Sequence, residues 1–294
     1  MLGLLNVYKP KGISSYDVIR QVRRRLGREV KTGHAGTLDP MAEGVLLVCI
    51  GPATRLVGVL QSHEKEYVVT AELGATSSTD DTEGEIRPTG AAAPAGEAVA
   101  AAVREFIGTI RQVPPAHSAV KVFGRRAYQL ARQGKDVKLT ARQVAVHALE
   151  ILHYGWPVLK LRVICGGGTY IRALVRDVGG RLGVGGYCRE LIRTRIGPFR
   201  AESAVKMEDL EAGPIQRLLI PPAEALPPDQ RLPVSDAQAG QLALGREVEY
   251  PSLPESAMQQ QALGAVDAGG RLIALVRPEP QTGRIRPVKV FPPA

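Results

Sequence analysis

The chain has little that would carry it into or across a membrane. No apolar run approaches the roughly 20 residues that a membrane-spanning helix requires. The N-terminal residues, MLGLLN, have no basic group ahead of an apolar stretch, so the pattern of a secretory signal is absent. Together these absences predict a cytoplasmic protein with no membrane association.

Cysteine is scarce, and its distribution excludes the chemistries that need several thiols. The three cysteines, Cys49, Cys165 and Cys188, are an odd number and lie far apart, near apolar or glycine-rich sequence. A disulfide framework or a zinc site needs more cysteines at closer spacing, and none of the three has a convincing histidine partner in the sequence. We therefore expect three reduced and mostly buried thiols.

Motifs for nucleotide cofactors and calcium are also missing. Three glycines at 166–168 precede an expected helix, an arrangement that suits anions, but no Gly-Lys-Ser/Thr follows to make a phosphate loop. No dinucleotide-binding fingerprint occurs either. Residues 79–84, TDDTEG, contain paired aspartates without the spacing of a calcium loop, so they predict a solvated turn.

What the chain does have is size, apolar content and a surplus of positive charge. Its 294 residues exceed the usual length of one domain, which favours one large and one small domain. Hydrophobic residues make up 44% of the chain, which is ample for a buried core. The formal charge of +9 favours a polyanionic partner, nucleic acid first and an anionic membrane surface second.

Hydrophobic periodicity outlines the secondary structure. Residues 4–8 read as a short strand, and Ser14 or Ser15 is placed to cap a helix that Gly27 ends. Arginines lie off the apolar stripe of this helix, where they form either a solvated surface or a contact with an RNA backbone. Further strands are expected at residues 46–50, 67–73, 144–151 and 159–165.

Two more helices and two boundaries complete this outline. The helices are expected on the apolar faces of residues 99–107 and 171–178, the second capped by Thr169. Residues 88–98 are rich in Ala, Gly and Pro and predict a flexible connector, and the prolines of residues 220–233 mark a boundary. The short apolar runs and glycine-rich turns beyond it predict a small β-rich domain.

A basic segment with two aromatic residues follows Pro114 and Pro115. Phe123 and Tyr128 lie among lysines and arginines, a composition that suits a loop lying on a nucleic acid. An ordinary exposed helix and turn explains the same pattern equally well. The basic residues are Lys121, Arg125, Arg126, Arg132, Lys135 and Lys138.

Asp39 lies in the most constrained setting of any acidic residue. Residues 33–46 read GHAGTLDPMAEGVL, so glycines surround Asp39 and Pro40 follows it. Glycine accepts backbone angles that other residues avoid, and a following proline restricts Asp39 to extended conformations. Such a segment can hold one carboxylate rigidly at a ligand, although a tight surface turn with a hydrogen-bonding aspartate has the same composition.

Six segments, taken in order, resemble the TruB family, the pseudouridine synthases that modify uridine 55 in the T-loop of transfer RNA. The segment around Asp39 is similar to the catalytic motif of the family, and CGGGTYIR at 165–172 is similar to its arginine motif. The other four are NVYKPKGISS at 6–15, KEY at 65–67, PPAHSAVK at 114–121 with GRRAY at 124–128, and LIRTRIGPF at 191–199. The tail resembles a PUA RNA-binding domain.

The resemblance implies an α+β fold, with a mixed, mainly antiparallel sheet, flanking helices and an inserted thumb. It places the catalytic domain at residues 1–228, the thumb at about residues 114–140, and the PUA domain at residues 229–294. The implied reaction isomerises uridine to pseudouridine: the N1–C1′ bond breaks, the uracil turns, and C5 bonds to C1′. Because no redox step and no net group transfer occurs, neither a cofactor nor a metal is expected.

The resemblance also implies three catalytic residues. Asp39 would be the catalytic carboxylate, a group suited to act as nucleophile or base. Arg172 would pair with it and offset the cost of keeping a carboxylate charged where water is excluded. Tyr67 would stack on the turned uracil, and its hydroxyl could help remove a proton late in the reaction. From the residues alone, Arg172 reads as an exposed helix residue and Tyr67 as part of a strand core.

Eight residues are implied in binding the RNA. His34 would fill or shape the space that a flipped uridine leaves, and Leu191 would form an apolar wall of the uracil pocket. The thumb would close over the T-arm stem-loop and the PUA domain would grip the acceptor end, with no obligatory protein partner. The remaining implied binding residues are Lys9, Gly36, Tyr170, Lys121, Arg126 and Arg132.

Three alternatives stay open at this point. A relative guided by a separate RNA would share the motif around Asp39, although the thumb segment and the short tail favour a stand-alone enzyme. A non-catalytic RNA-binding or RNA-folding protein would not need a buried carboxylate facing an anionic ligand. A basic membrane-surface protein would need an amphipathic helix with large exposed apolar residues, which the sequence lacks.

Overall fold

The computed structural model describes most of the chain: residues 1–118, 121–122, 125–127, 130, 133, 139–250, 253, 263–279 and 281–292. Contacts divide the chain into two compact units. The first unit is Met1–Leu38, Val45–Ser62 and Gly197–Ala294, and the second unit is Asp39–Gly44 and His63–Ile196. This division follows spatial contacts rather than sequence motifs, and the domain boundaries expected at residues 228 and 229 stay a prediction.

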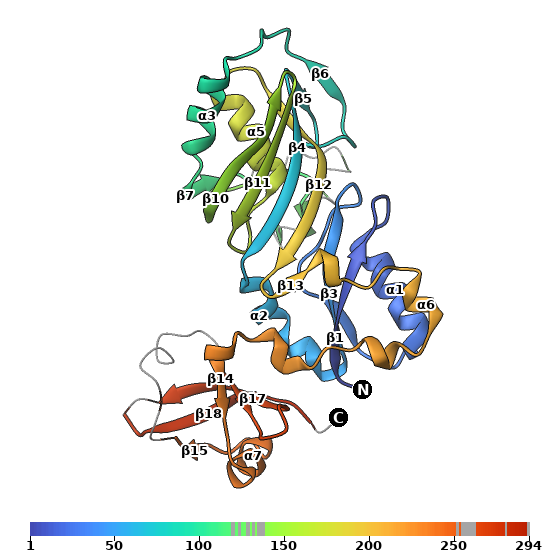
Figure 1. Ribbon diagram of the computed structural model, residues 1–294, viewed down its shortest axis with the longest axis vertical. Coiled ribbons are helices and arrows are strands. Elements are labelled where there is room, and N and C mark those ends of the chain that lie inside the picture. The colour runs from blue at the N-terminus through green and yellow to red at the C-terminus, as the bar shows by residue number, and fades with distance from the viewer. Residues whose placement is uncertain are drawn as a thin grey trace. The chain divides into compact units, whose positions relative to one another are not determined.

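An antiparallel sheet forms the second unit. Two helices, α3 (Gly96–Arg104) and α5 (Ile171–Arg181), cover one face of it (Figure 1). The burial of β4 alternates strictly along the strand, as the sequence pattern predicts for a strand with one buried face. The order of the strands is β12 (Gly186–Ile196), β4 (Lys65–Leu73), β11 (Val158–Cys165), β10 (Arg142–Gly155) and β7 (Gly108–Gln112).

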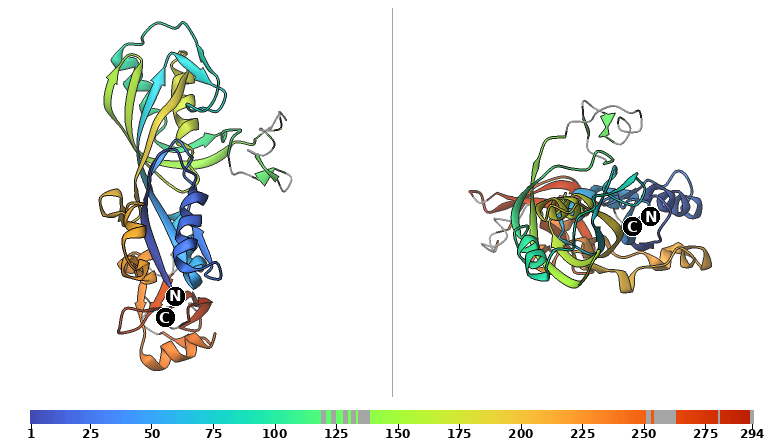
Figure 2. Two further views of the ribbon diagram at one scale, coloured as in Figure 1. Left: turned by 90° about the vertical axis from the view of Figure 1, so that its right-hand side faces the viewer. Right: turned by 90° about the horizontal axis from the view of Figure 1, so that it is seen from above.

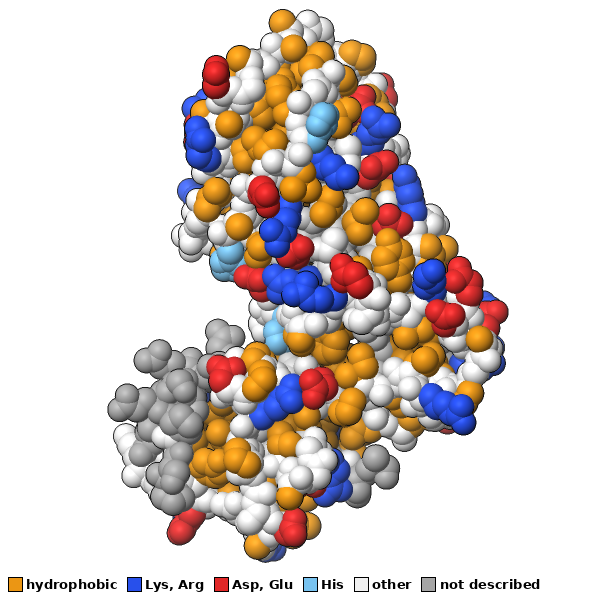
Figure 3. Space-filling view, in the orientation of Figure 1, with side chains coloured by type: hydrophobic (Ala, Val, Ile, Leu, Met, Phe, Trp, Pro, Cys, Tyr) orange, Lys and Arg blue, Asp and Glu red, His pale blue; other side chains and the backbone are white. Residues whose placement is uncertain are grey.

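The opposite face of this sheet carries side chains of both charges. Arg162 on β11 lies 3.1 Å from Glu66 on β4 and 3.4 Å from Glu150 on β10. Arg195 on β12 pairs with Glu64 at 2.5 Å. Figure 3 shows the blue and red side chains of this face interspersed. The face is therefore close to charge balance and is not a basic surface of the kind that binds a polyanion.

Two short hairpins accompany the sheet in the second unit. One pairs β5 (Ala75–Ser77) with β6 (Ile86–Pro88), and the other pairs β8 (Lys121–Val122) with β9 (Arg125–Arg126). The β8–β9 hairpin stands clear of the sheet (Figure 2). It lies within the expected thumb, about half of which falls outside the described residues.

Gly44 allows β3 (Glu43–Ile50) to approach β12 closely. Glu43 and Gly44 pair in parallel with Ile192 and Arg193 of β12. Gly44 has a φ of +104°, and a Cβ atom there would lie 2.2 Å from the carbonyl oxygen of Arg193. Only glycine fits this position, which anchors the chain a few residues after Asp39.

The N-terminal part of the first unit joins three strands and a helix. β1 (Gly3–Lys9) and β2 (Thr32–His34) are neighbours of β3, and α1 (Ser15–Leu26) packs through Val18 and Val22. Ser14 caps α1 in a reciprocal capping box with Asp17. The expected strand, helix and cap are confirmed. The chain continues from β3 through η1 (Gly51–Leu56) and α2 (Val57–Ser62).

The C-terminal part of the first unit is rich in β-structure, as the sequence predicts. It has its own five-stranded sheet and a separate core, against which α7 (Asp236–Ala243) packs through Ala239 and Leu242. The strand order is β14 (Arg231–Pro233), β16 (Leu263–Val266), β17 (Leu272–Glu279), β18 (Arg284–Val290) and β15 (Val248–Glu249). Before it lie β13 (Phe199–Arg200), η2 (Ala201–Ser203), α6 (Asp209–Ala212), η3 (Ile215–Leu218), η4 (Pro222–Ala225) and η5 (Pro228–Gln230).

Three local predictions were wrong at element ends. The helix expected over residues 99–107 ends at Arg104, and Ile107 is 44% exposed, since the chain turns there into β7. Thr169 does not cap α5: the N-cap is Tyr170, whereas the Thr169 hydroxyl donates to the carbonyl oxygen of Gly166. β10 is longer than residues 144–151 because it pairs along its length with β11 and at its start with β7.

We predict that Gly44→Ala lowers the free energy of unfolding by about 2 kcal/mol or more, because Ala is strained at this positive φ and its methyl group would meet the Arg193 carbonyl. Urea denaturation measures the change. Gly58→Ala is the matched control: Gly58 lies exposed in α2 with no atom near its would-be Cβ, so alanine should raise stability by up to about 1 kcal/mol. Equal effects of the two substitutions would contradict the steric argument.

Candidate active site

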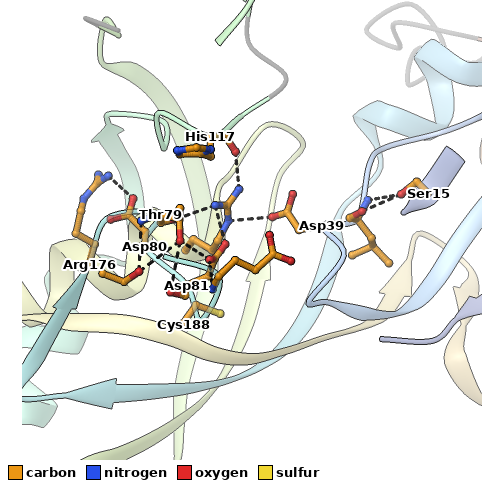
Figure 4. Close-up of polar contacts among 12 residues, drawn as sticks. Ser15, Asp39, Thr79, Asp80, Asp81, His117, Arg176 and Cys188 are labelled. Atoms are coloured by element: carbon orange, nitrogen blue, oxygen red, sulfur yellow. Dashed lines mark hydrogen bonds and ion pairs between the residues drawn. The ribbon is translucent and has the colours of Figure 1, made fainter. Parts of the chain in front are cut away.

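The chain presents Asp39 at a turn that leads into β3. The carbonyl oxygen of Asp39 accepts a hydrogen bond from the Ala42 amide at 3.1 Å, which closes the turn. The preceding residue, Leu38, is held by Ser15, whose hydroxyl donates to the Leu38 carbonyl at 2.9 Å and accepts from the Leu38 amide at 2.8 Å (Figure 4). The backbone is therefore fixed on both sides of Asp39, while its side chain stays 36% exposed.

Each of the three guanidinium nitrogens of Arg172, the second residue of α5, has at least one partner. Nε lies 2.9 Å from Oδ2 of Asp39, and Nη1 lies 2.9 Å from Oδ2 of Asp81. Nη1 also donates to the Thr79 carbonyl at 2.8 Å, and Nη2 donates to the His117 carbonyl at 2.9 Å (Figure 4). The ion pair that the resemblance implies between Asp39 and Arg172 is therefore present. The catalytic role of either residue stays a prediction.

The charge of Arg172 is secured by its surroundings. Burial opposes the charged form, but the carboxylates of Asp39 and Asp81 outweigh it, so the pKa of the guanidinium is raised above its usual value. The Arg172 side chain is only 5% exposed, in contrast to Asp39. The site therefore combines a partly exposed carboxylate, Asp39, with a buried and permanently charged guanidinium in contact with it.

The prediction of a solvated turn at residues 79–84 holds only in part: Thr82 and Glu83 are exposed, but Asp81 is buried. Asp81 is 2% exposed, and besides Arg172 its carboxylate accepts hydrogen bonds from the Thr79 hydroxyl and the Glu83 amide. Asp80 adopts a positive φ of 61°, and its carboxylate lies 2.8 Å from Nη1 of Arg176. Two adjacent aspartates thus meet two arginines one helical turn apart on α5. This pairing joins residues about 90 positions apart, which a local sequence pattern cannot reveal.

Tyr67 and Leu191 lie on the buried side of neighbouring strands. Tyr67 on β4 is 7% exposed and stands opposite Arg193 of β12, and Leu191 stands opposite Val69. Burial raises the pKa of the Tyr67 hydroxyl, while a hydrogen bond with Arg193 and the charge of that arginine oppose the rise. Tyr67 therefore stays protonated at neutral pH, and its expected roles in stacking and proton removal stay predictions.

Arg193 is a further functional candidate. It belongs to the motif at residues 191–199, but the sequence indicated no role for it. It is 2% exposed, and its backbone lies against Gly44 while its side chain contacts the Tyr67 hydroxyl. It also affects Lys65: burial lowers the pKa of the Lys65 ammonium to about 8, and the charge of Arg193 contributes to this. No local pattern marked this arginine as buried, because register shifts interrupt the alternation along β12.

Tyr170 connects the start of α5 to β7. The side-chain amide of Gln112, at the end of β7, accepts from the Tyr170 amide at 2.8 Å and donates to the Tyr170 carbonyl at 3.0 Å. Gln112 is only 1% exposed. Burial raises the pKa of the Tyr170 hydroxyl, against the charge of Arg142. The structure thus brings Asp39, Tyr67, Tyr170, Arg172 and Leu191 into the same compact unit.

The other expected binding residues are in the first unit or outside the described side chains. Lys9 is fully buried, and its Nζ donates to the carbonyls of Pro10 and Ile13 at 3.0 and 2.8 Å. His34 lies half-buried in β2, opposite Val48, and Gly36 has a φ of +103° in the loop that follows. The side chains of Lys121 and Arg126, and all of Arg132, lie outside the described residues. Their binding roles stay predictions.

The three cysteines are buried free thiols, as expected. Burial raises the pKa of Cys49 to about 12 and that of Cys165 to about 11, and it raises the pKa of Cys188 as well. All three therefore remain uncharged near neutral pH. Among the described residues no group of His, Cys, Asp and Glu has a geometry that would hold a metal ion, and no described helix is long and apolar enough to cross a membrane.

Comparison with protein families places three consecutive matches on the chain. Residues 23–171 match "TruB family pseudouridylate synthase (N terminal domain)". Residues 172–224 match "tRNA pseudouridylate synthase B C-terminal domain", and residues 230–292 match "tRNA Pseudouridine synthase II, C terminal". The matched segments include the turn around Asp39, the helix α5 and the C-terminal sheet.

Individual proteins are similar along the full length. "tRNA pseudouridine synthase B" of Dehalococcoides mccartyi is 39% identical over 99% of this chain and 97% of its own, and that of Thermobifida fusca is 42% identical over 98% of both. A chain in the "Crystal structure of the archaeal box H/ACA sRNP Nop10-Cbf5 complex" superposes with a TM-score of 0.74. It is 27% identical, and the match covers 99% of this chain and 86% of that one.

We predict that Asp81→Asn lowers the free energy of unfolding by about 1.5–3 kcal/mol, because it weakens a charged hydrogen bond to a buried guanidinium. Urea denaturation measures the change. Glu105→Gln is the control, since it removes a carboxylate from another arginine of α5, Arg181, in a pair about half exposed on each side. That substitution should cost less than about 1 kcal/mol. Equal decreases in the free energy of unfolding for the two variants would show that burial of the Asp81–Arg172 pair does not increase its contribution to stability.

The lowered pKa of Lys65 predicts a pH dependence of stability. Between pH 8 and 10.5 the unfolded chain keeps a proton on Lys65 that the folded chain has released, so stability should rise with pH in this window. Relative to Lys65→Met, the free energy of unfolding of the unchanged protein should increase by on the order of 2–3 kcal/mol across the window. Chemical denaturation at several pH values tests this. A stability difference that stays constant from pH 8 to 10.5 would refute it.

Proposed function

Because the chain belongs to the TruB family of pseudouridine synthases, we propose that it isomerises uridine 55 in the T-loop of transfer RNA to pseudouridine, with Asp39 as the catalytic carboxylate. The names of the relatives at 39–42% identity, all "tRNA pseudouridine synthase B", support transfer RNA as the substrate. The observation that carries the proposal is the ion pair of Asp39 and Arg172, in which the carboxylate is 36% exposed and the guanidinium 5%.

This geometry suits the isomerisation chemically. The reaction breaks the N1–C1′ bond, turns the uracil and joins C5 to C1′, so it needs a group that acts on the sugar or the base while the base is detached. A charged carboxylate can serve as that nucleophile or base. The buried positive charge of Arg172 favours the ionised form of Asp39 as RNA displaces water from the site. Hydrogen bonds fix the backbone at Leu38 and at Asp39 itself, so the carboxylate is presented in one orientation.

Tyr67 and Leu191 complete the proposed uracil site from β4 and β12. The ring of Tyr67 would stack on the turned uracil, and Leu191 would form an apolar wall beside it. Burial raises the pKa of the Tyr67 hydroxyl, so Tyr67 carries its proton before the reaction begins. The target base lies inside a folded loop, so it must leave its stack at a cost of about a few kcal/mol. His34 is proposed to occupy the vacated space.

The remaining chain would supply the grip on the RNA. The basic thumb would close on the T-arm, and the C-terminal PUA-like domain would hold the acceptor end. Both contacts would depend on phosphate charge and RNA shape, so affinity for transfer RNA should fall steeply with added salt. The chain would act alone, without guide RNA or partner protein, and the expected cytoplasmic location stays a prediction.

Non-catalytic RNA binding explains the site less well. A half-exposed carboxylate in a proposed RNA site repels phosphate, and an arginine that binds RNA would not be buried between two carboxylates. The guide-dependent alternative shares the fold, as the chain from the archaeal complex illustrates. A guide-dependent enzyme needs a guide RNA or helper proteins for activity, and an assay of the purified protein alone measures this requirement.

We predict that the purified protein converts one uridine of an unmodified T-arm stem-loop without any added RNA or protein. Asp39→Asn should lower the single-turnover rate by at least about 10³-fold, because it removes the reacting charge, while transfer RNA binding stays within about twofold. Pseudouridine mapping and filter binding measure the two quantities. Glu97→Gln removes one exposed negative charge from α3 and should change neither.

The outcomes separate the three functions. Undiminished turnover by Asp39→Asn would refute the catalytic assignment. Activity that appears only with guide RNA or helper proteins would favour the guide-dependent function. Tight transfer RNA binding without any conversion would favour a non-catalytic RNA-binding protein.

A further inference from the structure

Arg172 is oriented by a carbonyl oxygen from outside the two acidic segments. Its Nη2 donates to the carbonyl of His117, whereas Nε and Nη1 are taken by Asp39, Asp81 and Thr79. His117 lies in residues 113–118, which form no helix or strand. The position of this carbonyl must therefore be set by contacts that the segment makes elsewhere.

Two such contacts lie immediately before Pro114 and Pro115. The side chain of Gln112 makes both hydrogen bonds to the backbone of Tyr170, the N-cap of α5, at 2.8 and 3.0 Å. Arg176 donates from Nη2 to the carbonyl of Val113 at 2.8 Å. Residues 112–117 are thus fixed to α5 at Tyr170, Arg172 and Arg176.

Arg176 is itself held in place by charge. Its Nη1 lies 2.8 Å from Asp80, and its Nε donates to Asp177 at 2.9 Å. Asp80 is adjacent to Asp81, which binds Arg172. Because residues 172 and 176 are one helical turn apart, the two arginines reach the same acidic turn and the same segment in parallel. A shift of residues 112–117 would break contacts of both.

From these contacts we infer that Gln112 and Arg176 are positioning residues for the reaction. They hold the segment 112–117 so that the His117 carbonyl fixes the guanidinium of Arg172, and through it the carboxylate of Asp39. This inference rests on the proposed function of Asp39.

The kinetic test uses Gln112→Met and Arg176→Gln, with Arg181→Gln as the control. Arg181 is on the same helix, but it pairs with Glu105 at a site more than half exposed on its own side. At saturating transfer RNA, the first two variants should lose at least about tenfold in single-turnover rate, with binding changed less than about twofold. Arg181→Gln should match the unchanged protein. Arg176→Lys keeps a charge for Asp80 and should give an intermediate rate.

A second measurement is independent of activity. In protein labelled with ¹⁵N-arginine, the Nε–H signal of Arg172 can be assigned by its loss in Arg172→Lys. Gln112→Met and Arg176→Gln should shift or broaden that signal, because the guanidinium loses its fixed partner, whereas Arg181→Gln should leave it in place. Circular dichroism at the assay temperature shows whether each variant is folded.

The outcomes decide the inference separately from the proposed function. Unchanged rates and an unmoved Arg172 signal in both variants would overturn it, and so would a loss confined to transfer RNA affinity. Absence of conversion by the unchanged protein would refute the proposed function, yet the Arg172 signal would still show whether Gln112 and Arg176 orient that side chain.

Discussion

One buried guanidinium is the interaction on which the site depends. Arg172 lies between two carboxylates, Asp39 and Asp81, and it also donates hydrogen bonds to the backbone carbonyls of Thr79 and His117. Removing a guanidinium from water costs several kcal/mol unless charges and hydrogen bonds replace the lost hydration. Here Asp81 and the two carbonyls supply these contacts on the buried side, and Asp39 is the partly exposed member of the group. The ion pairs of Arg172 therefore both hold the fold together and keep the Asp39 carboxylate at a position that solvent can reach.

The fold delivers to this guanidinium three segments that are distant in sequence. Asp39 arrives on the turn before β3, Asp81 on the loop between β5 and β6, and His117 on the segment after β7. The close contact of Gly44 with Arg193 fixes the first of these against β12. Each segment is irregular at the point where it meets Arg172, so regular elements on either side must set its position. A rigid sheet and one helix thereby hold a site made largely of loops.

Local patterns in the sequence identified five strands and three helices, but they did not identify β12. The alternation along residues 67–73 and the capping box at Ser14 depend only on neighbours in the chain, and the structure confirms both. Element ends were less accurate, because pairing across the sheet extends β10 and the turn into β7 shortens α3. The acidic turn at residues 79–84 was predicted to be solvated throughout, because its composition is that of an exposed turn. Only the distant partner Arg172 shows that Asp81 within it is buried.

The sequence by itself determined which residues could matter, through the glycine- and proline-bounded setting of Asp39 and the ordered motifs that contain Arg172 and Leu191. It also determined the surplus of positive charge. Only the tertiary structure decided that Asp81 is buried against Arg172, that Arg193 contacts Tyr67, and that the end of β7 is fixed to α5 through Gln112. The physical reason is that burial and ion pairing are properties of groups brought together across the fold, whereas a sequence pattern records only what lies nearby along the chain.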